Sequence, residues 1–305
     1  MELRRLRLLD ALARLGTVAA VADALSFSPS SVSVQLAQLE TEAGAKLLRR
    51  VGRTVELTPA GRRLADHAAE ALAADEAVRA ELATITDAPT GRLRLTIVQT
   101  PALALLPATL ERLATTAPDL QVEVYQRETI PALDELRART VDLVVGIEYD
   151  PVPVGRQRDL DRRDLMREDV LLATRPAARA SRSLADYEEL AWATGHHGTG
   201  LDAVLRNVCN RLAGFEPRIT HRSDDGLVLG ALVASGRAVA LLPALLTAAL
   251  PQITAHPITE ERLQRTIFTA TRTTATDAPG VAAVRDALHH SAAAVAAQRD
   301  DIIIP

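Results

Sequence analysis

Apolar residues recur at helical spacing in the first part of the chain and predict two short helices there. Leu6 and Leu9 lie on the apolar face of the first helix, and Gly16 is placed to end it, because glycine readily adopts the left-handed conformation that closes many helices. Thr17 can cap a second, alanine-rich helix over about 18–25 by accepting a hydrogen bond from a free backbone N–H. The small side chains of this helix allow a neighbouring helix to approach closely.

A third helix is predicted to start at Ser28 and Pro29, since serine caps free N–H groups and proline lacks only an N–H that the first helical position does not use. Its apolar positions share one face: Val32, Leu36, Leu39 and Ala43. The opposite face is small and uncharged, and it carries Ser30, Val34, Ala37, Gln38 and Thr41, with Ser33 beside them. Hydroxyl and amide groups can hydrogen-bond to base edges and valine can contact a thymine methyl, so this surface suits the major groove of DNA.

After Gly44, residues 46–58 are predicted to form two short strands around a turn at Gly52. We interpret this hairpin as the wing of a winged helix-turn-helix. Three arginines lie at or near its tip: Arg49, Arg50 and Arg53. Guanidinium groups in this position can bind phosphates or enter a narrow minor groove, although a solvated hairpin standing alone would have a similar composition.

Thr58 and Pro59 repeat the cap-and-proline pattern and start a long helix to about Ile85. Positions four and three residues apart form a heptad seam that is apolar except for one acid: Leu64, Ala68, Ala71, Asp75, Val78, Leu82 and Ile85. A helix of roughly 40 Å with such a seam needs a partner helix. The same chain could supply it, but we expect a second copy, so that two heads read the half-sites of a pseudo-palindromic promoter site.

The rest of the chain alternates strands and helices after a hinge-like segment at 87–91. Strands are predicted over about 93–98, 121–126 and 141–147, with helices between them. A second run of the same kind covers about 166–270. This alternation predicts parallel sheets, arranged as two α/β lobes that enclose a cleft.

Composition and charge fit a soluble protein with a basic head. The chain has 305 residues, enough for two or three domains, and 48% of them are hydrophobic. The net charge is −4, yet residues 1–63 carry ten basic and six acidic side chains, so the negative charge lies in the remainder. The first residues lack the apolar core of a signal peptide, and we expect a cytoplasmic protein without membrane contact. The single Cys209 excludes an internal disulfide.

The predicted head resembles the DNA-binding domain of the LysR-type transcriptional regulators. The resemblance rests on five stretches: Gly16–Leu25, Ser28–Ser33, Leu36–Glu40, Gly44–Leu48 and Arg53–Gly61. It implies that Arg53 approaches the minor groove and that the positions facing the operator are Ser28, Pro29, Ser30, Ser33, Val34 and Gln35. Two positions depart from the family pattern: Val34 stands where many members have a basic or polar residue, and Leu48 replaces the usual phenylalanine.

The resemblance continues, more weakly, to about residue 270 and implies a sensor similar to periplasmic binding proteins. The expected fold is multi-domain: an all-α winged helix-turn-helix head with a long linker helix, then a two-lobed α/β domain. We expect the DNA-binding domain at 1–58, the linker and dimerisation helix with its hinge at 59–90, and the effector-binding domain at 91–298. Within the last, lobe I comprises about 91–165 and 269–298, and lobe II about 166–268.

Polar residues at strand ends and helix starts are the candidates for effector binding, because open α/β sheets bind ligands at the carboxyl ends of their strands. Lobe I contributes Gln99, Thr100, Gln126, Glu128 and Gly146, and lobe II contributes His197, Gly198, Thr199 and His221. In the family that the chain resembles, a hydroxyl usually stands at the position of Thr100. His196 and His197 lack a third ligand at helical spacing, so we expect a polar loop, in the cleft or simply exposed, and no metal.

The expected function is a LysR-type regulator that binds double-stranded DNA and responds to a small-molecule effector in the interlobe cleft, without a cofactor. We expect a homodimer or, by family habit, a homotetramer, and leave contact with RNA polymerase open. The candidate dimer contacts are Leu64, Ala68, Ala71, Val78 and Leu82. The sequence shows no nucleophile elbow, phosphate loop or metalloprotease motif, so an enzyme is not expected. Two alternatives remain: a DNA-binding regulator or architectural protein without a ligand, and an exported solute-binding protein.

Overall fold

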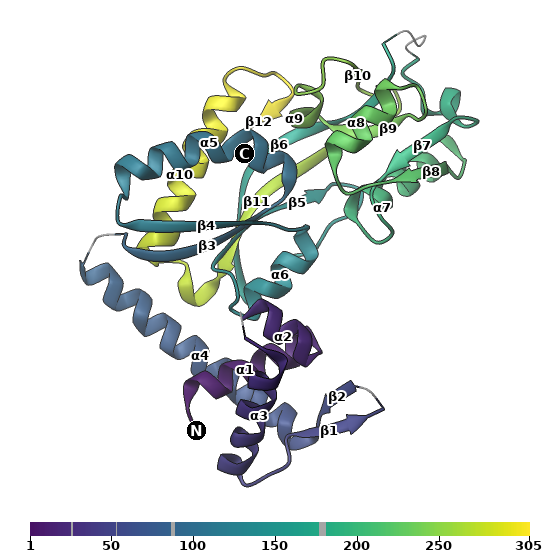
Figure 1. Cartoon of the computed structure of the whole chain (residues 1–305). Helices are drawn as coiled ribbons and strands as arrows, with labels where there is room; N and C mark the ends of the chain where they lie inside the picture. The colour runs from purple at the N-terminus through teal and green to yellow at the C-terminus, as the bar shows by residue number, and fades with distance from the viewer. Residues whose placement is uncertain (26, 53, 87–88, 177–180) are drawn as a thin grey trace.

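In the computed structural model, a small N-terminal head and a larger C-terminal domain are joined by a long helix (Figure 1). The structure describes residues 1–25, 27–52, 54–86, 89–176 and 181–305. Within these residues the predicted fold class is confirmed: a winged helix-turn-helix, a linker helix and a two-lobed α/β domain.

The head folds around the apolar faces predicted from the sequence. Its elements are α1 (Leu3–Leu15), α2 (Val18–Ala24), α3 (Pro29–Ala43), β1 (Leu48–Val51) and β2 (Thr54–Leu57). Gly16 closes α1 in the left-handed conformation, and the side chains of Thr17 and Ser28 accept hydrogen bonds at the starts of α2 and α3, as predicted. Leu9 and Leu36 are fully buried where these helices meet, so the caps and the apolar stripes together fix the helix-turn-helix.

The linker helix α4 (Pro59–Thr86) starts inside the head and runs toward the C-terminal domain (Figure 1). Its first turn is capped by Thr58, whose Oγ1 accepts a hydrogen bond of 3.0 Å from the Gly61 N–H. A Cβ at Gly61 would lie 2.1 Å from the carbonyl oxygen of Leu47. Glycine is therefore required at this position for α4 to pack against the segment that leads into the wing.

Lobe I is a sheet covered on both faces by helices. Its elements are β3 (Gly91–Ile97), α5 (Gln99–Thr116), β4 (Leu120–Gln126), α6 (Thr129–Arg137) and β5 (Leu143–Tyr149), with β11 (Gln264–Arg272), the 3-10 turn Thr273–Ala275 and α10 (Pro279–Ala296) returning from the end of the chain. Leu143 and Val145 of β5 face the core under α5 and α10, whereas Val144 faces the core under α6. In Figure 1, α5 and α10 lie side by side on one face of the sheet.

Lobe II is built around Trp192, which is fully buried beside Tyr187 and Phe215. Its elements are the 3-10 helix Leu184–Tyr187, β7 (Ala191–Thr194), α7 (Gly200–Val208), the π-helical turn Cys209–Ala213, β8 (Arg218–Arg222), α8 (Gly226–Ala234), β9 (Ala240–Pro243), α9 (Ala244–Thr247) and β10 (Thr254–His256). Strands β7 and β8 pair in parallel.

The long strand β6 (Leu160–Thr174) belongs to both lobes. Up to Asp169 it pairs with β11 of lobe I, and from Val170 onward it pairs with β9 of lobe II. The chain thus passes between the lobes about four residues later than the predicted 165, and it returns earlier than the predicted 268. The expected parallel pairing occurs between β3, β4 and β5 and between β7 and β8, whereas β9, β10 and β11 run antiparallel to β6.

The last residues form a strand that the sequence analysis did not predict. In β12 (Ile302–Ile303), Ile302 pairs with Glu168 and Ile303 with Arg167 of β6. Ile302 is buried in the core under α10. The C-terminal domain therefore extends beyond the predicted boundary at 298.

Candidate functional site

One face of α3 is uncharged and open to solvent. Val32, Leu36 and Leu39 are buried in the head. The predicted DNA-facing residues that are exposed at the start and along this helix are Ser28, Pro29, Ser30, Ser33, Val34 and Gln38. Val34 is 62% exposed, so this valine adds nothing to the core of the head and is free to contact another molecule.

Some polar groups of this face are already bonded within the head. The hydroxyls of Ser28 and Ser30 share a hydrogen bond of 2.9 Å, and Ser33 donates one to a backbone carbonyl one turn earlier. Gln35 differs from the other predicted contacts because it is half-buried, and its Oε1 accepts a hydrogen bond of 3.1 Å from Nε of Arg5 in α1. The Gln35 oxygen is thus turned toward α1 and not toward the exposed face.

The wing hairpin forms as predicted, with Leu48 paired to Leu57. Arg50 is exposed on β1, whereas the neighbouring Arg49 is paired with Glu56 at 2.8 Å. Arg53, predicted to approach the minor groove, lies outside the described residues. Arg50 is therefore the described wing arginine whose charge is available to a phosphate.

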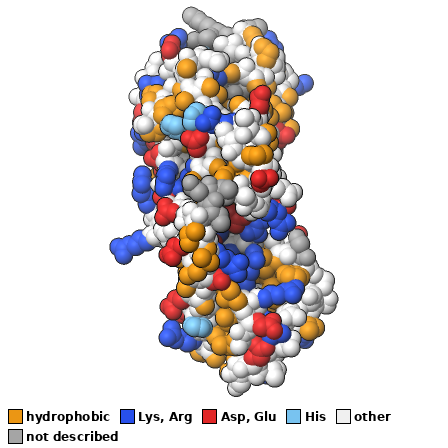
Figure 2. All heavy atoms as spheres, turned by 90° about the vertical axis from the view of Figure 1, so that its left-hand side faces the viewer, with side chains coloured by type: hydrophobic (Ala, Val, Ile, Leu, Met, Phe, Trp, Pro, Cys, Tyr) orange, Lys and Arg blue, Asp and Glu red, His pale blue; other side chains and the backbone are white. Residues whose placement is uncertain are grey.

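The predicted seam of α4 divides into two parts. Ala68 is fully buried in the core of the head, so the expectation that it contacts a second chain is wrong. Leu64 is half-buried against the same core, and its contact with a second chain stays a prediction. Ala71 is half-buried. Farther along, Val78 and Leu82 are 52% and 58% exposed, and Figure 2 shows hydrophobic side chains along this part of the molecule. The first turns of the stripe pack against α1, and only the later turns remain free.

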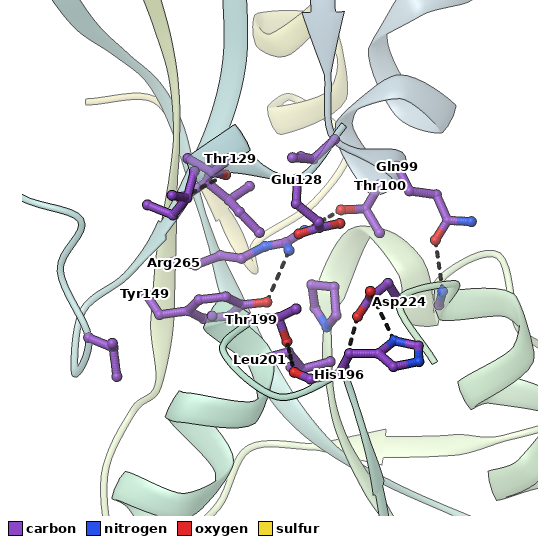
Figure 3. Close-up of a pocket in the computed structure, with 18 of the residues that line it drawn as sticks. Gln99, Thr100, Glu128, Thr129, Tyr149, His196, Thr199, Leu201, Asp224 and Arg265 are labelled. Atoms are coloured by element: carbon purple, nitrogen blue, oxygen red, sulfur yellow. Dashed lines mark hydrogen bonds and ion pairs between the residues drawn. The ribbon is translucent and has the colours of Figure 1, made fainter. Parts of the chain in front are cut away.

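A cavity of about 520 Å³ lies between the lobes (Figure 3). Six of the predicted effector residues line it: Gln99, Thr100, Glu128, His197, Gly198 and Thr199. Further polar lining residues are Thr129, Glu148, Tyr149, His196, Ser223, Asp224 and Arg265. The remaining wall is largely apolar, with Ile130, Val152, Leu201 and Leu229 among its members.

Three predicted effector residues lie outside the cavity wall: Gln126, Gly146 and His221. Gln126 ends β4, which is the edge strand of the sheet, and its side chain is exposed. Gly146 is covered by Phe268 and Thr129, since a Cβ there would lie 2.8 Å and 3.0 Å from their side chains. His221 lies within β8, and only the residues after that strand reach the cavity.

A buried ion pair forms one wall of the cavity. Strand register places Arg265 of β11 directly between Tyr149 of β5 and Glu168 of β6. Arg265 is 2% exposed and donates to Glu168 at 2.6 Å and 2.9 Å, to the Tyr149 hydroxyl at 3.4 Å and to the Thr100 hydroxyl. Burial disfavours the charge, but the attraction of Glu168 outweighs it and keeps the pKa of Arg265 raised. Glu168 also accepts a hydrogen bond from the Leu245 N–H at 2.7 Å.

The sequence gives only a weak signal for this pair. Arg265 precedes the apolar stretch of β11, and Glu168 is a buried acid between the charged Arg167 and Asp169 of β6. Buried charges are rarely retained without a partner, so each implies the other.

On the lobe II side, His196 and Asp224 are held together. Nδ1 of His196 lies 3.0 Å from the Asp224 carboxylate, and the His196 N–H donates to it at 2.8 Å. Thr199 donates to the carbonyl of His196 at 2.8 Å. The loop that was predicted as polar therefore has a defined conformation at the cavity (Figure 3).

Gln99 connects the two lobes. Its Nε2 donates to Asp225 at 2.9 Å, and its Oε1 accepts from the Gly226 N–H at 2.8 Å. Asp225 also caps α8 through the Leu227 N–H at 2.8 Å. One side chain of lobe I thus occupies the start of a lobe II helix.

Glu128 projects into the cavity from the lobe I side (Figure 3). Burial raises the pKa of its carboxyl and the negative charge of Asp224 raises it further, while Arg265 acts in the opposite direction and does not cancel these effects. No described residue donates a hydrogen bond to this carboxylate. When it is ionised, Glu128 therefore carries a negative charge to which no described residue is hydrogen-bonded.

A second group of charges joins the head, α4 and lobe I; we call Arg7, Asp10, Glu76, Arg139 and Arg272 the junction cluster. Arg272 of β11 is 7% exposed and contacts Glu76 of α4 at 2.7 Å. Arg139, in the left-handed conformation at φ +57°, accepts a hydrogen bond of 2.7 Å at its carbonyl from Arg7 of α1. Its guanidinium lies 3.6 Å from Asp10. Burial alone would raise the pKa of Glu76, but hydrogen bonds from Arg272 lower it.

Cys209 lies in the hydrophobic core of lobe II, where burial raises the pKa of its thiol to about 12. Among the residues that the structure describes, no three His, Cys, Asp or Glu side chains are arranged to hold a metal ion. None of the described helices combines the length and hydropathy that a bilayer crossing requires.

Two family models match the chain. The model described as the LysR substrate binding domain matches residues 86–293, and that of a bacterial regulatory helix-turn-helix protein, lysR family, matches residues 3–62. A curated relative from Streptomyces viridosporus, named as a probable hydrogen peroxide-inducible genes activator, is 30% identical over 258 residues, covering 79% of this chain and 80% of that protein.

Solved structures share the arrangement of the whole chain. Full-length OxyR from Pseudomonas aeruginosa, in a variant form, matches with a TM-score of 0.65 and 21% identity over 95% of this chain and 98% of that one. Full-length CbnR in complex with its target DNA matches with a TM-score of 0.54 and 24% identity over 95% of this chain and 100% of that one. At these identities the matches establish the fold.

Proposed function

The chain belongs to the LysR family of bacterial transcriptional regulators, and on that premise we propose that α3 and the wing form its DNA-binding surface and that the interlobe cavity is its effector site. Family membership makes it a DNA-binding transcription regulator with an effector-binding domain, and not an enzyme. It also decides against an exported solute-binding protein, which would have no use for the head.

The observation that carries the proposal for the head is the uncharged, exposed face of α3. Ser30, Val34 and Gln38 are small or flexible enough to reach base edges, and Arg50 of the adjacent wing can bind phosphate. The exposed turns of α4 around Val78 and Leu82 would pair two chains, so that two heads contact a pseudo-palindromic promoter site. In this proposal the protein acts in the cytoplasm as a homodimer or homotetramer, and contact with RNA polymerase is a further step.

For the sensor, the proposal rests on a cavity enclosed by two lobes that a single side chain, Gln99, already connects. An effector that bridges the lobes would favour one relative arrangement of them. Strand β11 contributes Arg265 to the cavity and Arg272 to the junction cluster, so a shift of this strand would reach α4 directly. A coupling of this kind typically amounts to about 1–3 kcal/mol.

The effector is not expected to act through a thiol. One relative is named for peroxide-inducible genes, but Cys209 is the single cysteine of this chain. It is buried, and with its pKa raised to about 12 it is not a thiolate at neutral pH. We therefore propose a ligand that binds non-covalently.

The test for the head is a binding titration with the intergenic DNA beside the gene, carried out without effector. Gln38→Ala should weaken binding to that fragment by roughly 1–3 kcal/mol and leave binding to random duplex unchanged. Arg50→Ala should weaken binding to both and reduce the salt slope by about one. The matched controls are Gln121→Ala and Arg158→Ala, exposed residues of the C-terminal domain. Equal affinity of the wild type for promoter and random DNA would overturn the assignment of α3.

The same intergenic DNA fragment tests the alternative of a DNA-binding protein without a ligand. Footprints and DNA bend angles are compared with and without cell-extract metabolites, because a regulator that senses a ligand changes one of them. A footprint and bend that never change would favour a DNA-binding protein without an effector.

A further inference from the structure

We propose that the effector is a small organic cation, an amine with an apolar body, whose ammonium group lies between Glu128 of lobe I and Asp224 of lobe II. The inference depends on the proposed function, because it takes the interlobe cavity to be the effector site.

The first observation concerns the charges of the cavity wall. Among the described residues each charged group that lines the cavity has a partner of opposite charge or a histidine beside it, with the exception of Glu128. Arg265 is neutralised by Glu168 at 2.6 Å. Glu148 is held by both terminal nitrogens of Arg162 at 2.9 Å and 3.0 Å. The two arginine–carboxylate pairs cancel, which leaves the carboxylates of Glu128 and Asp224 without a guanidinium partner.

The second observation is where this charge lies. Glu128 and Asp224 project into the cavity from opposite lobes (Figure 3). The groups whose charges act on Glu128 are Asp224 and Arg265, and Asp224 makes its ionisation harder. Two carboxylates that repel each other across a gap are both stabilised by a cation placed between them. Such a cation would also hold the lobes together.

The third observation concerns the opposite charge. An anion needs a free cationic group or a free helix N-terminus, and the guanidinium of Arg265 is already bound to Glu168. At the start of α8, the Gly226 N–H is bonded to Gln99 and the Leu227 N–H to Asp225. The starts of α5, α6 and α7, which have no side-chain cap, also line the cavity, and each offers at most about half an elementary charge. Glu128 is the N-cap of α6 and opposes that partial charge with a full negative charge when it is ionised.

The apolar wall indicates the rest of the ligand. Ile130, Val152, Leu201 and Leu229 come from both lobes, and a volume of about 520 Å³ is within the range of small-molecule sites. Burial of an apolar body there would supply most of the affinity, and the ammonium would supply orientation and selectivity.

The test uses three probes with one carbon skeleton: 3-phenylpropylamine, 3-phenylpropanol and 3-phenylpropanoate. Binding to the full-length protein is measured by isothermal titration calorimetry at neutral pH. We expect the amine to bind at least tenfold more tightly than the alcohol, and the propanoate to bind most weakly. Glu128→Gln should lose the preference for the amine, whereas Glu111→Gln, an exposed site on α5, should keep it.

Stronger binding of the propanoate, or an amine preference that survives in Glu128→Gln, overturns the proposal. So does the absence of measurable amine binding at 10 mM. Binding of the propanoate alone would still support the cavity as an effector site, so the charge class would fail and the proposed function would stand. The promoter titration is done without effector and is independent of this result.

Unliganded protein provides a second readout. A carboxyl whose pKa is raised by folding destabilises the fold once it is ionised, so its cost is absent below the ordinary value of 4.5 and complete above the raised pKa. Glu128→Gln should therefore raise the thermal midpoint at pH 7.5, and the gain should shrink as the pH falls toward 4.5. A variant that is less stable than the wild type at pH 7.5 would show that Glu128 is already compensated, contrary to the proposal.

Discussion

At the scale of single residues, the cavity depends on a buried ion pair more than on any exposed polar group. Arg265 and Glu168 are 2% and 0% exposed, and Thr100 and Tyr149 complete the contacts of the guanidinium. A buried pair contributes little net stability against an apolar replacement of both partners, but loss of one partner leaves the other charged and unpaired.

We predict that Arg265→Met lowers the free energy of unfolding by about 3–5 kcal/mol, because Glu168 is then a lone charge in the core. Urea unfolding followed by fluorescence of Trp192, the single tryptophan, measures this change. Addition of Glu168→Leu to Arg265→Met should recover part of the loss. Arg158→Met, at an exposed position, is the control. A loss below about 1 kcal/mol for Arg265→Met would contradict the prediction.

Cavity-lining residues that follow strand ends could be predicted from the sequence, whereas cavity-lining residues within strands could not. Thr100, Glu128 and Thr199 line the cavity because they follow strands at the carboxyl edge. Arg265 reaches it through the register of β11 against two neighbouring strands, and that register is a property of the folded sheet. Gln126 was predicted by the same rule, but it is still the last residue of β4 and is exposed, and only Glu128 beyond the strand reaches the cavity.

At the scale of elements, the linker helix shows how one stripe can serve two partners. Its heptad pattern is continuous in sequence, yet Ala68 is buried in the head while Val78 and Leu82 are exposed. The caps of α2, α3 and α4 were predictable because each depends on adjacent residues alone. The division of the seam into a buried and an exposed part could not be predicted, because it depends on where α1 packs against α4.

We predict that Leu82→Glu shifts the protein toward monomer, because a charge would be placed in the apolar contact between two copies of α4. Sedimentation velocity at micromolar concentration measures the change, and an increase in the dimer dissociation constant of at least tenfold is expected. Thr84→Glu, an exposed position on another face of the same helix, should leave the dimer intact. If both variants remain dimeric, α4 is not the contact.

At the scale of the whole molecule, the head and the C-terminal domain contact each other through the junction cluster as well as through α4. Asp10 of α1 is 2% exposed and lies close to Arg139, and Arg272 joins β11 to α4. The two-lobed architecture could be predicted from the alternation of strands and helices. The contact between the head and the C-terminal domain could not be predicted, because it joins residues more than a hundred positions apart and no sequence pattern links them.

We predict that Glu76→Gln weakens the contact between head and C-terminal domain by about 1–3 kcal/mol, because Arg272 and Arg139 lose their carboxylate. Hydrogen-exchange mass spectrometry should show faster exchange in α1 peptides, while peptides of the lobe II core around Trp192 stay unchanged. Glu81→Gln, an exposed acid on the same helix, is the control. Unchanged exchange in α1 would show that the junction cluster does not hold the head.

The pairing of β12 with β6 has a practical consequence for anyone converting this protein into a reporter. Ile302 lies in register with Glu168, the carboxylate that fixes Arg265 in the cavity wall, and the Asp169 N–H donates to the carbonyl of Asp301 at 3.2 Å. Trimming the final residues, or attaching a fluorescent protein immediately behind them, would disturb the sheet beside the ligand pocket. A label at the amino end, more than a hundred and fifty residues before β6 in sequence, avoids the pocket but adjoins the helices of the head. An insertion at the exposed turn around Gly155 keeps clear of both the β12 pairing and the head, but it lies beside Val152 and Val154 of the cavity wall, so a reporter inserted there would be coupled to the pocket.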